Sequence, residues 1–214
     1  MTFQDNMSRR TFLGLAGTIA AGAGLSLVGC GSGSPSSNSG ASAASTAATS
    51  ASPAAAAGSK SVIVLWLYTG NTLQMAERVS ELSGAEIYRI EAADPYPEDY
   101  QACADRAKQE QDDGVYPDIA NPIANWGDYD TVFLGYPIWW YEMPMIVQGF
   151  VRDHDWEGKT VVPFNSHEGS GDSGTYDDLR EMTGTTVVDG LAIRGESVAE
   201  SLDQVDAWYS RLDL

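Results

Sequence analysis

Residues 61–72 read Ser-Val-Ile-Val-Leu-Trp-Leu-Tyr-Thr-Gly-Asn-Thr, and this stretch decides the fold class of the chain. Residues 61–67 form a run that is apolar at every position after Ser61, which is typical of a parallel β-strand buried on both faces. Gly70 then allows a tight turn, and residues 72–82 carry apolar side chains at the spacing of one helix face. A buried strand that turns directly into a helix predicts an α/β fold with a parallel sheet.

The same alternation of strands and helices continues toward the C-terminus. The alternation predicts a single domain over residues 60–214 with a doubly wound five-stranded sheet. Within it, Pro163 lacks an N–H donor, so we expect it to mark the end of its strand. Further strands are expected at 85–90, 131–135, 160–164 and 186–193, helices at 98–111, 144–153 and 176–182, and a final helix with an apolar stripe of Val198, Leu202, Val205, Trp208 and Leu212.

Three short segments, each directly after a predicted strand, hold the candidate binding residues. In an open parallel sheet the loops at the carboxyl ends of the strands converge on one crevice, so these segments are expected to meet. The candidate cofactor-binding residues are Tyr68, Thr69, Gly70, Asn71 and Thr72 of the first segment, Pro137, Ile138, Trp139 and Trp140 of the second, and Ser166, His167, Gly169, Ser170 and Gly171 of the third.

The first two segments offer different chemistry. Backbone amides of residues 68–72, with the hydroxyls of Thr69 and Thr72, can hold a phosphate at the N-terminus of the following helix, where the helix dipole favours an anion. An ordinary helix cap is the alternative interpretation. Trp139 or Trp140 can form an apolar stacking wall for a flavin ring, although many tryptophans belong to the core. Adjacent side chains often point in opposite directions, so only one of the two is expected to touch the ring.

The third segment is small, polar and rich in glycine. Its amides can bond the O2/N3 edge of a flavin ring, and His167 can donate to the same edge and stabilise the reduced anion; the alternative is a polar surface histidine. Together the three segments suit a phosphorylated, flat aromatic cofactor, for which FMN is the obvious candidate. The chain has only two histidines and no Cys/His cluster, so no transition-metal site is expected.

The first part of the chain is interpreted as an export signal. An Arg9-Arg10 pair precedes an apolar run over residues 13–29, and residues 27–30 resemble a bacterial lipobox. We interpret residues 1–29 as a twin-arginine signal and Cys30 as the acylated first residue of the mature protein; an ordinary signal peptide with an incidental cysteine is the alternative. The protein is then expected on the outer face of the bacterial cytoplasmic membrane, held by its lipid anchor only.

Residues 30–59 are predicted to form the lipidated cysteine and a disordered linker. The linker consists almost entirely of Ser, Ala and Gly without charge, so it cannot bury enough apolar surface to fold. A flexible tether of this length has an rms span of roughly 30 Å. If Cys30 is acylated, Cys103 has no intramolecular partner, and the domain is expected to lack a disulfide.

The chain is strongly acidic. Without residues 1–29, which contain Arg9, Arg10 and Asp5, it has 10 basic and 29 acidic residues and a net charge of −19. Nucleic acid and anionic lipid surfaces are therefore not expected as partners. The charge fits either a solvated surface that aids solubility or electrostatic steering toward a basic redox partner.

Taken together, residues 61 to about 194 resemble the flavodoxin-like family, in particular the short bacterial flavodoxins. The matching pieces are Thr69-Gly70-Asn71-Thr72, residues 95–100, residues 133–140, Met143-Pro144, Pro163-Phe164 and residues 166–171. The resemblance implies the strand order 2-1-3-4-5, which places the first and third strands side by side. It also implies non-covalent FMN, with the phosphate on the first loop and the ring between the second and third.

One position departs from the family pattern. Leu67 stands where the family has the first serine of the phosphate loop, and the loss of one such hydrogen bond costs on the order of 1–3 kcal/mol, roughly ten- to a hundredfold in affinity. The main hypothesis is an exported, lipid-anchored FMN protein that exchanges electrons with a redox protein or a small acceptor such as a quinone, as a carrier or a reductase. The alternative is a flavodoxin-fold lipoprotein that has lost FMN and binds another ligand or a protein partner. Leu67→Ser should tighten FMN binding only under the first hypothesis.

Overall fold

The computed structural model describes residues 60–214. The predicted export signal of residues 1–29, the predicted acylation site at Cys30 and the predicted linker up to residue 59 lie outside the described residues. Within residues 60–214, no helix has both the length and the apolar character that a membrane span requires.

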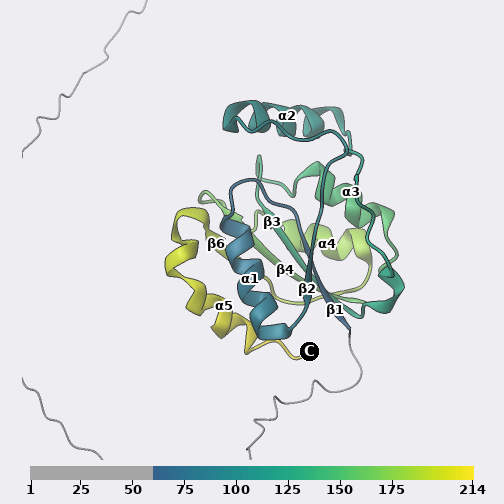
Figure 1. The fold of residues 1–214 in the computed structure, drawn as a ribbon, viewed down its shortest axis with the longest axis vertical. Helices are drawn as coiled ribbons and strands as arrows, with labels where there is room; N and C mark the ends of the chain where they lie inside the picture. The colour runs from purple at the N-terminus through teal and green to yellow at the C-terminus, as the bar shows by residue number, and fades with distance from the viewer. Residues whose placement is uncertain (1–59) are drawn as a thin grey trace, which may run out of the picture. The chain divides into compact units, whose positions relative to one another are not determined.

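A parallel β-sheet forms the centre of the domain (Figure 1). Its strands are β1 Ser61–Leu65, β2 Glu86–Arg89, β3 Thr131–Pro137, β4 Thr160–His167, β5 Thr186–Val187 and β6 Leu191–Arg194. They lie in the order β2-β1-β3-β4-β5, and β6 also pairs with β4. The predicted α/β class and the strand order 2-1-3-4-5 are therefore confirmed. Because β1 and β3 are neighbours, the loops that follow them flank one crevice.

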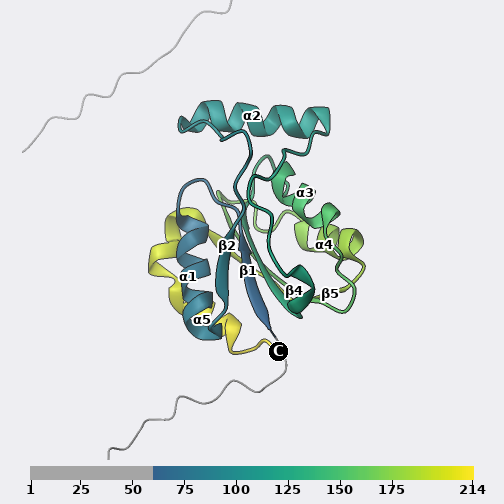
Figure 2. The ribbon, with the colours of Figure 1, turned by 45° about the vertical axis from the view of Figure 1, so that its right-hand side comes forward.

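Helices cover both faces of this sheet (Figures 1 and 2). The first face packs against α1 Asn71–Ser83 and α5 Leu202–Tyr209, and the second against α3 Met145–Asp153 and α4 Thr175–Thr183. The first strand shows why the apolar run is continuous. Val62 and Val64 belong to the core beneath α3 and α4, whereas Ile63 and Leu65 belong to the core beneath α1 and α5. All four side chains are buried, since both faces of the sheet are covered.

The position of Pro163 differs from the expectation. It lies inside β4, in register with Leu134 of β3, and β4 continues to His167. The last strand, predicted as one piece over residues 186–193, is split into β5 and β6, which pair with β4 on either side of Pro163. A proline cannot donate to a sheet ladder. The gap between β5 and β6 lies beside Pro163, so no ladder hydrogen bond is needed at the position where the N–H is missing.

The C-terminal apolar stripe is also divided between two elements. Val198 belongs to a 3-10 helix, η2 Gly195–Glu200, whereas Val205 and Trp208 belong to α5 and Leu212 follows the end of α5. Val198, Val205 and Trp208 are buried in the core beneath α1 and α5, so the stripe packs as a unit although the predicted single helix is wrong. A second 3-10 helix, η1 Trp126–Asp128, lies shortly before β3.

Helix α2 Tyr100–Asp113 lies across the carboxyl ends of the strands instead of on a sheet face (Figures 1 and 2). Its N-cap residue Asp99 accepts a backbone N–H of the first turn at 2.9 Å. The buried carboxylate of Glu110 accepts the Tyr96 hydroxyl at 2.7 Å and pairs with Arg106 at 2.8 Å. Burial, together with this bond to Glu110, raises the pKa of Tyr96 far above its ordinary value. The network ties α2 to the preceding loop and fixes it as a wall of the crevice.

Candidate functional site

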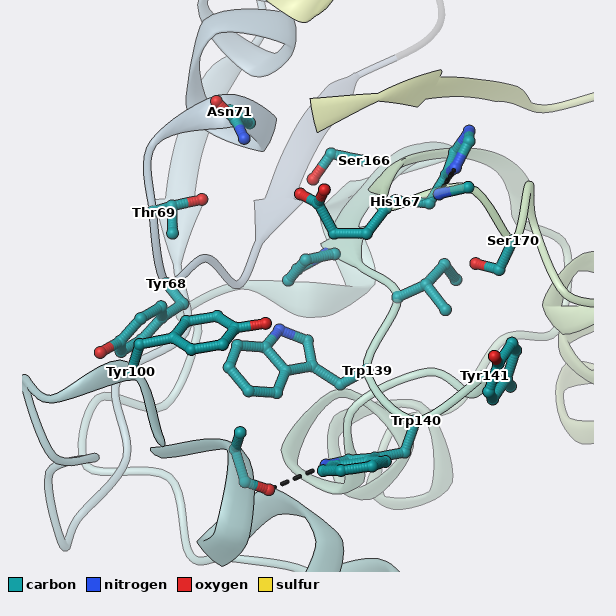
Figure 3. A pocket seen from close by; sticks show the side chains of 15 residues that line it. Tyr68, Thr69, Asn71, Tyr100, Trp139, Trp140, Tyr141, Ser166, His167 and Ser170 are labelled. Atoms are coloured by element: carbon teal, nitrogen blue, oxygen red, sulfur yellow. Dashed lines mark hydrogen bonds between the residues drawn. The ribbon is translucent and has the colours of Figure 1, made fainter. Parts of the chain in front are cut away.

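A cavity of about 550 Å³ lies at the carboxyl ends of β1, β3 and β4 (Figure 3). All but three of the predicted cofactor-binding residues line it; the exceptions are Gly70, Thr72 and Gly171. Figure 3 shows Asn71, Ser166 and His167 toward one end of the cavity, and Trp140 and Tyr141 toward the other. The lining residues are Tyr68, Thr69, Asn71, Tyr100, Ala104, Pro137, Ile138, Trp139, Trp140, Tyr141, Ser166, His167, Glu168, Gly169 and Ser170.

The first loop presents the N-terminus of α1 to this cavity. Gly70, the N-cap residue, has a φ of 101°, in the left-handed region that glycine tolerates best. No side chain caps the helix, and its first turn contains no acidic residue. The first N–H groups of α1 are thus available to an anion. Leu67 does not line the cavity, because its side chain packs against the core beneath α1.

Thr72 joins the first loop to the third instead of lining the cavity. Its side chain is buried, and its Oγ1 lies 2.8 Å from the Oγ of Ser166, which does line the cavity. A hydrogen bond between two buried hydroxyls leaves neither of them unsatisfied. The first and third loops are therefore held at a fixed separation at this end of the cavity.

The second loop contains a tight turn with two strained residues. The backbone groups of Trp139 and Glu142 exchange hydrogen bonds at 3.0 Å, and the two residues between them, Trp140 and Tyr141, have φ values of 51° and 65°. Positive φ at both central positions is the type I′ geometry, which Asn and Gly normally occupy. A bulky residue there costs about 1–3 kcal/mol, and such strain concentrates at functional sites. The turn holds Trp140 and Tyr141, 43% and 74% exposed, at the cavity.

Both tryptophans line the cavity, but their surroundings differ. The Trp139 ring is surrounded by the rings of Tyr68, Tyr100 and Trp66, with centroid distances of 5.5, 5.6 and 6.4 Å. Trp140 is held at its edge, where Nε1 donates to the carbonyl oxygen of Ala104 in α2 at 2.8 Å (Figure 3). Trp139 therefore forms a fixed aromatic wall, and Trp140 joins the second loop to α2.

The third loop is held by a buried amide. Nδ2 of Asn165 donates to the carbonyl oxygen of Gly171 at 3.2 Å, and its Oδ1 accepts the hydroxyl of Tyr176. Nδ1 of His167 accepts the N–H of Gly169 at 2.8 Å, so the neutral ring carries its proton on Nε2. Partial burial, followed by the positive charge of Arg194, lowers the pKa of His167 below its ordinary value. The site thus favours a neutral His167 with an Nε2–H donor.

Sequence reasoning missed four lining residues: Tyr100, Ala104, Tyr141 and Glu168. Tyr100 and Ala104 belong to α2, and the polar pattern of that helix does not reveal that it crosses the strand ends. Tyr141 and Glu168 are direct chain neighbours of predicted residues, so slightly longer binding segments would have included them. No group of His, Cys, Asp and Glu that could hold a metal ion is found within residues 60–214.

The fold and the cavity define a doubly wound α/β protein with a ligand site at the carboxyl ends of its strands. The chain belongs to the flavodoxin family, which matches residues 60–212. It is similar to two solved candidate flavoproteins: one from Bacteroides eggerthii DSM 20697, with 30% identity and a TM-score of 0.58 over 70% of this chain and 99% of that chain, and one from Bacteroides uniformis ATCC 8492, with 28% identity and a TM-score of 0.63 over 72% and 99%.

A third solved structure, a flavoprotein in complex with FMN from Lactobacillus acidophilus NCFM, shares the fold. Its identity is 19% and its TM-score 0.54, over 68% of this chain and 99% of that chain. The comparison with curated proteins gives no significant match.

Proposed function

We propose that this protein binds FMN non-covalently and transfers electrons through it. The observation that carries the proposal is the convergence of three chemically different loops on one cavity of about 550 Å³. An uncapped helix N-terminus suits a phosphate, an aromatic wall suits a flat ring, and a glycine-rich loop suits the polar edge of that ring. Membership of the flavodoxin family and the fold shared with the FMN complex from Lactobacillus acidophilus support the proposal.

Each loop of this chain has a distinct part in the proposed binding. Thr69, Asn71 and the first amides of α1 would hold the phosphate, and Trp139 would stack on the ring. The loop that contains His167 would meet the polar edge of the ring, with Nε2–H as a donor. When bound, FMN supplies the redox chemistry, whereas these residues orient it and adjust its affinity.

We propose that the electrons are exchanged with a redox protein or a small-molecule acceptor. The net charge of −18 supports the approach of a basic protein partner, because a strongly acidic surface steers opposite charges toward it. The exposed aromatic side chains Trp140 and Tyr141 at the cavity support contact with an apolar group close to the ring.

We also propose that the protein is exported and held at the outer face of the cytoplasmic membrane by a lipid on Cys30. The support is the order of the Arg9-Arg10 pair, the apolar run and the cysteine in the sequence. Cells that express the chain in the presence of a labelled fatty acid should label the wild type and not the Cys30→Ala variant. Equal label on both, or on neither, would reject the anchor.

Titration of the purified full chain with FMN tests the redox proposal. We expect saturable quenching of flavin fluorescence at one FMN per chain, because an aromatic wall against a flavin ring shortens the life of its excited state. Reduction of the complex with dithionite, followed by reoxidation, should then be reversible. Flavin fluorescence that stays unquenched when the protein is in large excess over FMN would reject FMN as the ligand and favour another occupant of the same cavity.

A further inference from the structure

The carboxylate of Glu168 lies at the end of the cavity proposed for the phosphate. Glu168 lines the cavity together with Asn71, the first residue of α1. A Cβ added to Gly195 would lie 2.6 Å from Nδ2 of Asn71 and 3.0 Å from Oε1 of Glu168. Both side chains thus lie close to the same glycine, at the end of the cavity where Figure 3 shows Asn71 and Ser166.

No cationic side chain of the cavity balances this carboxylate. None of the lining residues is a lysine or an arginine. Arg194 pairs in register with His167 on the neighbouring strand, but its Nε is engaged by Oε1 of Glu196 at 3.2 Å. The phosphate end of the cavity therefore contains a helix N-terminus and one carboxylate.

The helix N-terminus explains why a carboxylate is tolerated there. Helix α1 has neither a side-chain cap nor an acidic residue in its first turn. A negative charge beside the N-terminus of a helix is favourable, because it opposes the helix dipole. Glu168 supplies that charge from the third loop, and its exposed side chain is free to move away when another anion arrives.

We propose that Glu168 is a displaceable anion at the phosphate end of the site, and that it limits how strongly the site prefers FMN over riboflavin. This inference rests on the proposed function. Riboflavin has the same ring as FMN but no phosphate, so it can bind with the carboxylate in place. FMN must push the carboxylate aside, because two negative groups at short range repel each other.

Glu168→Gln tests the effect of the phosphate on affinity separately from that of the ring. In titrations of the full chain, the variant should bind FMN about three- to tenfold more tightly than the wild type, and riboflavin with unchanged affinity. Salt screens repulsion between exposed charges, so the gain for FMN should shrink as NaCl rises from about 20 mM to about 500 mM. A purely structural effect of the substitution would change both flavins alike and would not depend on salt.

Glu142→Gln is the matched control. It removes the same charge from a neighbouring loop, but the Glu142 side chain does not line the cavity, and its bonds to Trp139 use only backbone atoms. It should leave both affinities unchanged. An equal change for both flavins in Glu168→Gln, no change, or weaker FMN binding would overturn the inference while the proposed function stands. A wild-type chain that binds neither flavin would overturn both.

Discussion

Gly135→Ala is expected to lower the free energy of unfolding by about 3 kcal/mol, because it overpacks the centre of the sheet. Gly135 lies in β3 between Leu65 of β1 and Phe164 of β4. An added Cβ would lie 2.4 and 2.5 Å from two ring carbons of Phe164 and 3.0 Å from Cδ1 of Leu65. The Phe164 ring is fully buried and packs near Trp208 of α5, so it cannot turn away into solvent. Urea unfolding followed by tryptophan fluorescence measures the change.

Two variants give this prediction its controls. Gly127→Ala adds the same methyl group where no atom outside the local backbone and the adjacent residues lies within 4 Å, and it should leave the unfolding midpoint nearly unchanged. Combining Gly135→Ala with Phe164→Leu should recover about 1 kcal/mol relative to additive effects, because the smaller side chain makes room for the Cβ. A Gly135→Ala protein as stable as the wild type would contradict the close approach of these three strands.

The fold class could be predicted because its signal is local. A strand buried on both faces needs apolar residues at every buried position, and residues 62–65 satisfy this in β1. The strand ends could not be predicted in the same way. Trp66 is buried like the strand residues although β1 ends at Leu65, so burial continues beyond the sheet pairing. The place of Pro163 depends on a gap between β5 and β6, which belong to a segment more than 20 residues away.

The residues of the candidate site could be predicted where they come directly after a strand in the sequence. The three loops meet because parallel strands bring their carboxyl ends to one edge. The wall formed by Tyr100 and Ala104 depends on the path of α2, which is a tertiary property. The turn at Trp140 and Tyr141 has no sequence signature either, because a type I′ turn is normally recognised by Asn and Gly. The strained turn therefore contradicts local preference at the place where the cavity gains its exposed aromatic groups.

Trp139→Ala is expected to weaken FMN binding by about 2–3 kcal/mol, roughly thirty- to a hundred-and-fiftyfold. The reason is that the Trp139 ring is fixed by Tyr68, Tyr100 and Trp66 before any ligand arrives. A stacking surface that is already ordered loses little conformational entropy on binding, so most of its contact energy contributes to affinity. Fluorescence titration of the full chain with FMN measures the loss, and Trp139→Phe, which keeps a ring, should retain most of the affinity.

Trp140→Gly distinguishes the two tryptophans by its effect on FMN affinity. Trp140 has a φ of 51°, so glycine relieves backbone strain of about 1–3 kcal/mol. More than half of the Trp140 side chain is covered and its Nε1 donates to Ala104, so the loss of these contacts offsets the relief and the free energy of unfolding should change by less than about 2 kcal/mol. FMN affinity should fall less than in Trp139→Ala. A larger loss of FMN affinity in Trp140→Gly would make Trp140 the stacking wall and Trp139 its support, since both rings line the same cavity.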